Sequence, residues 1–199
     1  METEQQKIDK LRQECWNGAL HTFGKGYIFD NRSKKYGRWV NLLKASGIVV
    51  PTAIGGTALA YGYNSDYLAL AISLAVPLTI AQLIISVFAV VFKWDDEFAY
   101  SIEASQQYSV LADNFKKLGQ FPPSTFDELE KEYNIENTKH KSRIEQDSKH
   151  YLKEWELRKG MRYALREFKR ECYGCEEVPK SMKSTDCDIC GQFKWYNLK

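Results

Sequence analysis

Four of the five cysteines stand near the C-terminus in two CxxC pairs that could hold a metal ion. Eleven residues separate the pairs, and the candidate ligands are Cys172, Cys175, Cys187 and Cys190. Each pair can place two thiolates on one ion, and two pairs complete a tetrahedral site. Gly191, directly after the second pair, suits the tight turn of a zinc knuckle. Because four thiolates leave no position for an activated water, the sequence predicts a structural zinc that takes no part in catalysis.

The alternatives for these cysteines are disulfides and an iron–sulfur cluster. A reducing cytosol disfavours two disulfides, and no further feature of the sequence supports a cluster. The fifth cysteine, Cys15, stands alone in a helical pattern and is expected to be a small buried apolar residue. After the cysteine pairs, Phe193, Trp195 and Leu198 alternate with polar residues, which predicts a short strand.

The segments that must position this site divide into an apolar quarter and a charged remainder. Residues 45–93 carry only Asp66 and Lys93, whereas residues 1–44 have a net charge of +4 and residues 94–199 a net charge of −2. Since the tail is mildly acidic, direct nucleic-acid binding is not expected. The soluble parts contain no glycine-rich phosphate loop, no GxSxG or HExxH motif and no compact carboxylate pair, so we do not expect an enzyme.

Two apolar runs, residues 45–63 and 67–92, predict membrane spans. The second has 26 residues without a charge, more than the roughly 20 needed to cross a bilayer core. The first is diluted by four glycines and interrupted by Pro51, which membrane helices tolerate; a buried helix of a soluble domain is the alternative. Lysine and arginine flank the two runs on their outer ends, and the turn between them carries only Asp66, so both termini are predicted to be cytosolic.

One face of each predicted span carries small and hydroxyl-bearing residues. The stripe of the second span contains Ala71, Ala75, Thr79, Gln82, Ser86 and Ala89. The stripe of the first span contains Ser46, Ala53, Thr57, Ala60 and Asn64. Such stripes either pack two helices closely or line a water-filled pathway, and the amide of Gln82 would be costly if it faced lipid. Because two helices cannot enclose a pore, a channel would require a homo-oligomer.

The predicted fold class is mainly α, with a two-helix transmembrane hairpin, cytosolic helices and a small C-terminal module that resembles a zinc ribbon. The predicted domains are an N-terminal cytosolic amphipathic helix and juxtamembrane segment (1–38), the hairpin (39–93), a cytosolic helical region (94–171) and the four-cysteine zinc module (172–199). Apolar spacing from Ile8 to Phe23 predicts the N-terminal helix, which is expected to end near Gly24 and Gly26.

Beyond the second span, the sequence predicts three helices. The first continues from the membrane and is stopped at Gly119 and the prolines that follow. Thr125 begins a capping box for a short helix through Tyr133, and a long charged helix is expected over about 138–171. Glutamates are interspersed among the basic residues of this long helix, which favours a solvated face over contact with nucleic acid or anionic lipid headgroups. These basic residues are Arg158, Lys159, Arg162, Arg166, Lys169 and Arg170.

A two-span hairpin with a cytosolic helical tail resembles the SLATT family of bacterial two-transmembrane effectors. The spacing of the four cysteines is similar to the defining motif of a mobile-element-associated CxxC-x(11)-CxxC protein family. The resemblance implies an anti-phage, abortive-infection role in which a partner sensor, such as a nucleotide synthase or a reverse transcriptase, detects infection. The effector then oligomerises and permeabilises the bacterial inner membrane. The alternative is a membrane-anchored scaffold whose helices and zinc ribbon recruit protein or nucleic acid.

Overall fold

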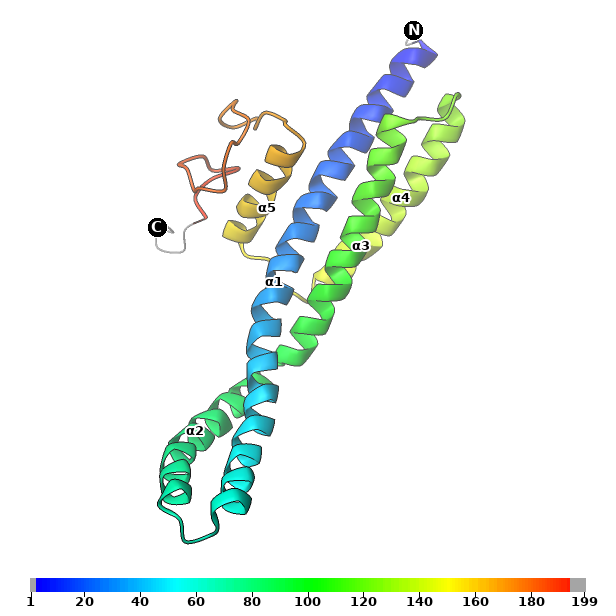
Figure 1. Cartoon of the computed structure of the whole chain (residues 1–199). Coiled ribbons are helices and arrows are strands. Elements are labelled where there is room, and N and C mark those ends of the chain that lie inside the picture. Colours follow the sequence, from blue (N-terminus) through cyan, green and yellow to red (C-terminus); the bar gives the residue numbers. More distant parts are fainter. Residues whose placement is uncertain (1–2, 194–199) are drawn as a thin grey trace. The chain divides into compact units, whose positions relative to one another are not determined.

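The computed structural model describes residues 3–193, which contain five α-helices and no strand (Figure 1). The helices are α1 (Glu4–Tyr61), α2 (Asp66–Val91), α3 (Trp94–Gln120), α4 (Phe126–Asp147) and α5 (Glu154–Glu167). Two compact units divide the chain: unit 1 has residues 1–31 and 102–199, and unit 2 has residues 32–101. The prediction of a mainly helical protein is confirmed. Trp195 and Leu198 of the predicted strand lie outside the described residues.

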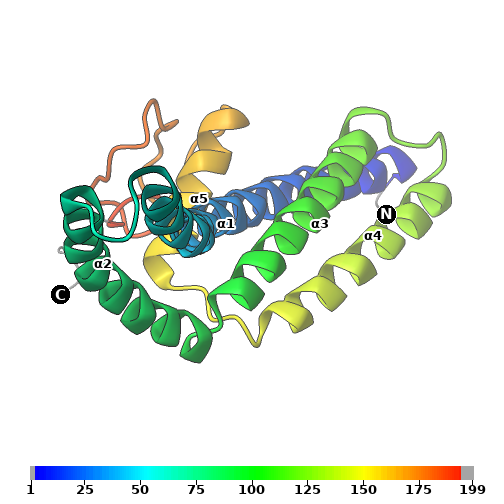
Figure 2. The same cartoon turned by 60° about the horizontal axis from the view of Figure 1, so that its bottom comes forward.

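In unit 1, the first half of α1 has α3 and α4 on one side and α5 on the other (Figures 1 and 2). The core between α1, α3 and α4 contains Cys15, Leu118 and Leu129. Burial, with a smaller contribution from the charge of Glu14, raises the pKa of the Cys15 thiol to about 11. Cys15 is therefore a buried, un-ionised residue, as the sequence predicted.

A buried polar network joins α3 to α4. The Arg143 guanidinium, only 2 % exposed, donates from Nε and Nη2 to Asp147 Oδ1 at 3.1 and 3.0 Å, and from Nη1 to Gln107 Oε1 at 3.0 Å. The Tyr108 hydroxyl donates to the other Asp147 oxygen. A buried charge requires such partners, and the network therefore fixes the last turn of α4 against α3.

The structure corrects the predicted boundaries of the helices beyond Thr125. The predicted cap is present, since the Thr125 hydroxyl accepts from the Glu128 backbone N–H, but α4 continues through Tyr133 to Asp147. The long helix predicted over 138–171 is wrong, because residues 148–153 are not helical and α5 begins only at Glu154. The burial of Asp147 is a tertiary effect, and the charged sequence around it contains no glycine or proline that would signal the break.

The predicted end of the N-terminal helix near Gly24 and Gly26 is also wrong, because α1 continues to Tyr61. Gly24 instead provides a close crossing with α5. A Cβ at Gly24 would lie 3.0 Å from the Gly160 carbonyl oxygen, and a Cβ at Gly160 would lie 2.7 Å from that of Gly24. Tyr27 and Tyr163 stack beside this crossing with ring centroids 3.9 Å apart. Both glycines therefore permit helix packing and do not terminate a helix.

We expect Gly160→Ala to lower the thermal midpoint of unfolding. A Cβ 2.7 Å from a backbone oxygen places the cost in the upper part of the roughly 1–3 kcal/mol typical of overpacking, above the roughly 1 kcal/mol gained in helix propensity. The matched control is Gly26→Ala, whose Cβ would meet Tyr108 Cβ at an ordinary 3.4 Å and whose midpoint should equal or exceed that of the wild type. Circular dichroism melts of the full chain measure both. A midpoint for Gly160→Ala at or above that of the wild type would contradict the close crossing.

Unit 2 contains the second half of α1, all of α2 and the start of α3. Gly62, with φ of +82°, follows the last residue of α1, and a side chain would be strained in this conformation. The Ser65 hydroxyl caps α2 by accepting from the Leu68 N–H at 3.2 Å. The two apolar helices are thus joined by a four-residue connection, residues 62–65.

Contacts within unit 2 hold α1 beside α2 and beside the start of α3. Tyr61 and Tyr67 are in ring contact with centroids 5.0 Å apart, next to the connection between α1 and α2. Farther from the connection, a Cβ at Gly47 of α1 would lie 3.1 Å from Gln82 Nε2 of α2. At the far end, Lys44 Nζ of α1 lies 2.7 Å from Asp95 Oδ1 of α3.

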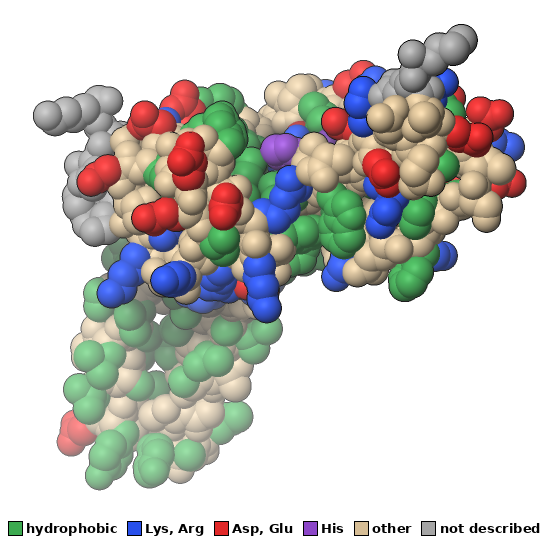
Figure 3. Space-filling model, turned by 90° about the horizontal axis from the view of Figure 1, so that it is seen from above, with side chains coloured by type: hydrophobic (Ala, Val, Ile, Leu, Met, Phe, Trp, Pro, Cys, Tyr) green, Lys and Arg blue, Asp and Glu red, His purple; other side chains and the backbone are tan. Residues whose placement is uncertain are grey.

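The apolar segments of α1 and α2 are long and apolar enough to cross a membrane. The chain itself covers little of them: at most 6 % of either segment is buried, and Leu59 and Val90 are 86 % and 78 % exposed. Figure 3 shows hydrophobic side chains over the surface of this unit. A soluble protein does not expose so large an apolar surface, which indicates membrane association.

Candidate metal centre

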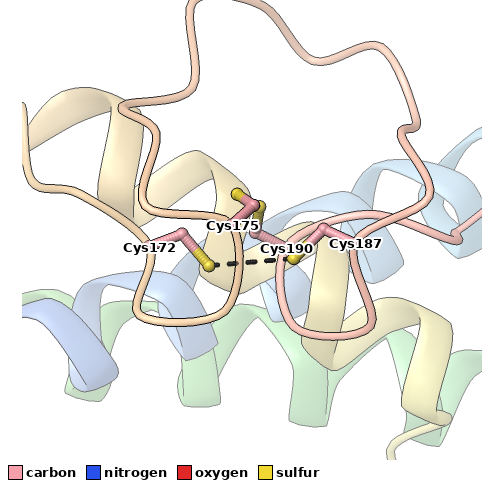
Figure 4. Close-up of side chains that lie close together, drawn as sticks. All are labelled: Cys172, Cys175, Cys187 and Cys190. Atoms are coloured by element: carbon pink, nitrogen blue, oxygen red, sulfur yellow. Dashed lines mark hydrogen bonds between the residues drawn. The ribbon is translucent and has the colours of Figure 1, made fainter.

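The four predicted cysteine ligands come together in unit 1 (Figure 4). All four Sγ atoms lie within 4.8 Å of one another. The Sγ atoms of Cys172 and Cys187 are 3.9 Å apart, and those of Cys175 and Cys190 are 3.8 Å apart. A tetrahedral ion with metal–sulfur bonds of about 2.3 Å separates its sulfurs by about 3.8 Å. The donor set therefore fits one tetrahedral metal ion of that size.

Each CxxC pair is shaped by a tight backbone turn. The Glu176 N–H donates to the Cys172 carbonyl at 2.7 Å, and the Gly191 N–H donates to the Cys187 carbonyl at 2.8 Å. A Cβ at Gly191 would collide with the carbonyl oxygen of Thr185. The tight turn that the sequence predicted at Gly191 is confirmed, and its reason is close contact between two backbone segments.

The thiols have unequal acidities before any metal binds. Burial raises the pKa of the Cys187 thiol, but hydrogen bonds with the backbone N–H groups of Cys190 and Ile189 and with the Cys190 and Cys175 thiols together lower that pKa to about 7. Burial is the largest cause that raises the pKa of Cys190. Metal ligation requires thiolates, so a bound ion must displace a proton from Cys190 at neutral pH.

The cysteines are part of the core of unit 1. Cys172 and Cys190 are 1 % and 0 % exposed and share an apolar cluster with Leu20 of α1 and with Ala164 and Leu165 of α5. Cys175 and Cys187 are half-buried at the edge of the same cluster. The two CxxC turns, Cys172–Cys175 and Cys187–Cys190, are called the first and the second knuckle below. A metal ion bound between them would consequently stabilise the packing of α5 on α1.

Arg162 is a site residue that sequence reasoning missed. The sequence places it on a solvated basic face, but its side chain is buried against the second knuckle, where its guanidinium donates to the carbonyl and sulfur of Cys190. Arg158 and Arg166 of the same run have solvent-exposed acidic partners, Glu154 and Glu167. The spacing of Arg162 three residues before the apolar Leu165 is the available signal, because such positions share a helix face.

The stripe of the second span lies largely on the side of α2 that faces α1. Ala75 is buried, and Ala71, Gln82, Ser86 and Ala89 are half-buried. Thr79 is exposed, and its hydroxyl donates to the Ala75 carbonyl at 2.8 Å. The structure thus brings most of this stripe into the contact between the two helices.

The stripe of the first span is only partly on α1. On this helix Ser46 and Thr57 are half-buried, whereas Ala53 and Ala60 are exposed. Asn64 is also exposed, but it lies in the connection after α1 and not on the helix. The Ser46 and Thr57 hydroxyls donate within α1, to the carbonyls of Leu43 and Ala53. Only part of this predicted face therefore contacts α2.

Residues 3–193 contain five helices, of which two are apolar enough to span a membrane, and four clustered cysteines. These features define a helical candidate membrane protein with a metal-binding motif. One family model, described as Mobilome CxxCx(11)CxxC protein, matches residues 12–193. The chain belongs to this family, which confirms the predicted relationship to mobile-element-associated CxxC proteins. No curated protein and no solved structure matches the chain.

Proposed function

We propose that the chain is a SLATT-type membrane effector of a bacterial anti-phage, abortive-infection system. It oligomerises and permeabilises the inner membrane when a partner sensor, by resemblance a nucleotide synthase or a reverse transcriptase, triggers it. The observation that carries the proposal is the uncovered apolar surface of unit 2, which requires lipid around it. Membership of a family described as part of the mobilome supports a role in conflict between bacteria and mobile elements.

The two apolar helices would cross the membrane as a hairpin with both termini in the cytosol. Tyr61 and Tyr67 are in contact near the connection, and Trp39 of α1 and Trp94 of α3 are 6.2 Å apart just beyond the opposite end of the two apolar segments. Such pairs suit the two membrane interfaces, where aromatic side chains are enriched. Lysine and arginine lie only on the tryptophan side, which supports the predicted orientation.

The ion of the cysteine centre would be a structural zinc. Sulfur separations of 3.8 and 3.9 Å match tetrahedral zinc–thiolate geometry. Four thiolates supply a complete ligand set, so the centre would stabilise the fold of unit 1 without taking part in catalysis.

Self-association in the membrane is supported by the outer side of α1. Thr52, Gly56 and Ala60 are exposed at intervals of four residues, and a Cβ at Gly56 would meet nothing within 4 Å. Small residues at this spacing allow neighbouring membrane helices to approach closely. A second protomer is a suitable partner for this surface.

Expression of the full chain in bacterial cells, together with its triggering partner, tests the proposal through a membrane-potential dye. We expect the triggered wild type to depolarise cells and Gln82→Leu to abolish the effect, because leucine removes the amide that a water-filled pathway needs in α2. Ile84→Leu, on the exposed apolar side of α2, is the matched control and should depolarise like the wild type. If cross-linking detects oligomers while the potential stays unchanged, the pore proposal is wrong.

A membrane-anchored scaffold is the second candidate, and a specific observation favours it. Gln82 already lies against Gly47 within one chain, and Ala75 is buried between the same helices. Helix packing alone thus explains much of the polar stripe. A scaffold should keep its cellular activity in the Gln82→Leu variant, which separates it from the pore.

A further inference from the structure

We infer that Arg162 is a positioning residue that stabilises the metal–thiolate centre by donating to the Cys190 sulfur. The inference rests on the zinc site proposed above. Four thiolates around a divalent ion leave an excess of negative charge, and a cation within hydrogen-bond distance offsets it. Arg162 is the arginine of α5 that reaches a ligand sulfur.

The guanidinium of Arg162 is held in place by four acceptors of the cysteine module. Its Nε donates to the Ser181 carbonyl at 2.7 Å. Its Nη1 lies 3.3 Å from Thr185 Oγ1, 3.3 Å from the Cys190 carbonyl oxygen and 3.7 Å from Cys190 Sγ. These bonds connect α5 to both sides of the second knuckle, so the side chain has little freedom to turn away from the sulfur.

The burial of Arg162 is explained by the charge of the centre. The residue is 7 % exposed, and a buried guanidinium is costly without a negative partner. Within the described part of the chain, its hydrogen-bond partners are carbonyls, one hydroxyl and one sulfur, with no carboxylate among them. Thiolates at the metal centre supply the missing negative charge.

Zinc transfer from the loaded full chain, in detergent, to a competing chelator tests this role. A cleft of about 610 Å³, lined by Arg162 together with Cys175, Cys187 and Cys190, gives the chelator access to the ion. Arg162→Met should weaken zinc retention by roughly 10- to 100-fold, the usual effect of losing a partner of a metal ligand. Arg162→Lys, which keeps the charge but not the fork of donors, should be intermediate.

The matched control is Arg166→Met, one helical turn further along α5. Arg166 pairs with Glu167 and lies over the Tyr163 ring at 5.3 Å. This variant should retain zinc like the wild type. Retention by Arg162→Met equal to that of the wild type would overturn the inference.

A second measurement separates the electrostatic role from a merely structural one. We expect Arg162→Met to lower the midpoint of thermal unfolding more in the zinc-loaded chain than in the chelator-treated chain. In the cobalt-substituted protein, the same variant should shift the sulfur-to-cobalt charge-transfer absorption band. If the unfolding midpoint falls equally with and without zinc and the absorption band does not shift, the inference is wrong, although the zinc site itself would stand. Wild-type protein that binds no zinc would instead overturn both the zinc proposal and the inference.

Discussion

Cys190→Ser should strongly weaken metal binding and destabilise the packing of α5 on α1. Serine does not ionise at neutral pH, so the tetrahedral site would keep only three of its four thiolates. The new hydroxyl would also lie in a fully buried apolar cluster, at a cost of roughly 1–3 kcal/mol if it found no partner. Structural zinc contributes about 10–16 kcal/mol of apparent binding free energy in small zinc domains, so the loss of metal is the larger effect.

Elemental analysis and circular dichroism of purified chain measure this result. Cys15→Ser is the matched control, because Cys15 is equally buried but lies in the separate core between α1, α3 and α4. It should keep its metal and lose only modest stability. A Cys190→Ser chain with the metal content of the wild type would show that the four cysteines do not form the site.

The double substitution Leu78→Arg and Leu83→Arg should prevent stable membrane insertion of α2. Both leucines are exposed near the middle of Asp66–Val91, and each arginine there costs about 2.5–3.5 kcal/mol, so the pair costs about 5–7 kcal/mol. Fractionation with alkaline extraction should move the protein out of the membrane pellet or lead to its degradation.

Val110→Arg is the control for the arginine substitution itself. Val110 is an exposed apolar residue of α3 in unit 1, where arginine would face water. This variant should fractionate with the membrane like the wild type. If the double variant of α2 also stayed in the extracted membranes, the helix would not be held there by its apolar surface.

The features that the sequence predicted well are those that neighbouring residues determine. The cysteine spacing brings four thiolates within reach of one ion because each CxxC turn is closed by its own backbone bonds. The long apolar run of α2 and the cap at Thr125 are similarly local, and the observed helices begin within one residue of them. Such signals need no knowledge of the rest of the fold.

The features that the sequence did not reveal depend on contacts between distant segments. Gly24 has the pattern of a helix end, yet α1 continues past it and Gly160 of α5 packs closely against it. Helix α4 ends at Asp147, whose carboxylate is buried against α3, and the neighbouring sequence gives no sign of that burial. Arg162 has the pattern of a solvated arginine, and only the return of the second knuckle to α5 buries it.

Labelling with a membrane-impermeant thiol reagent most directly tests a membrane-inserted hairpin with a cytosolic metal centre. Asn64→Cys adds an exposed thiol to the connection between α1 and α2, and the five native cysteines serve as the internal reference. In intact spheroplasts, the Asn64→Cys chain should be labelled and the wild type should not. Permeabilisation together with a zinc chelator should then label both. An unlabelled Asn64→Cys chain, or a labelled wild type, in intact spheroplasts would contradict the hairpin with both termini in the cytosol.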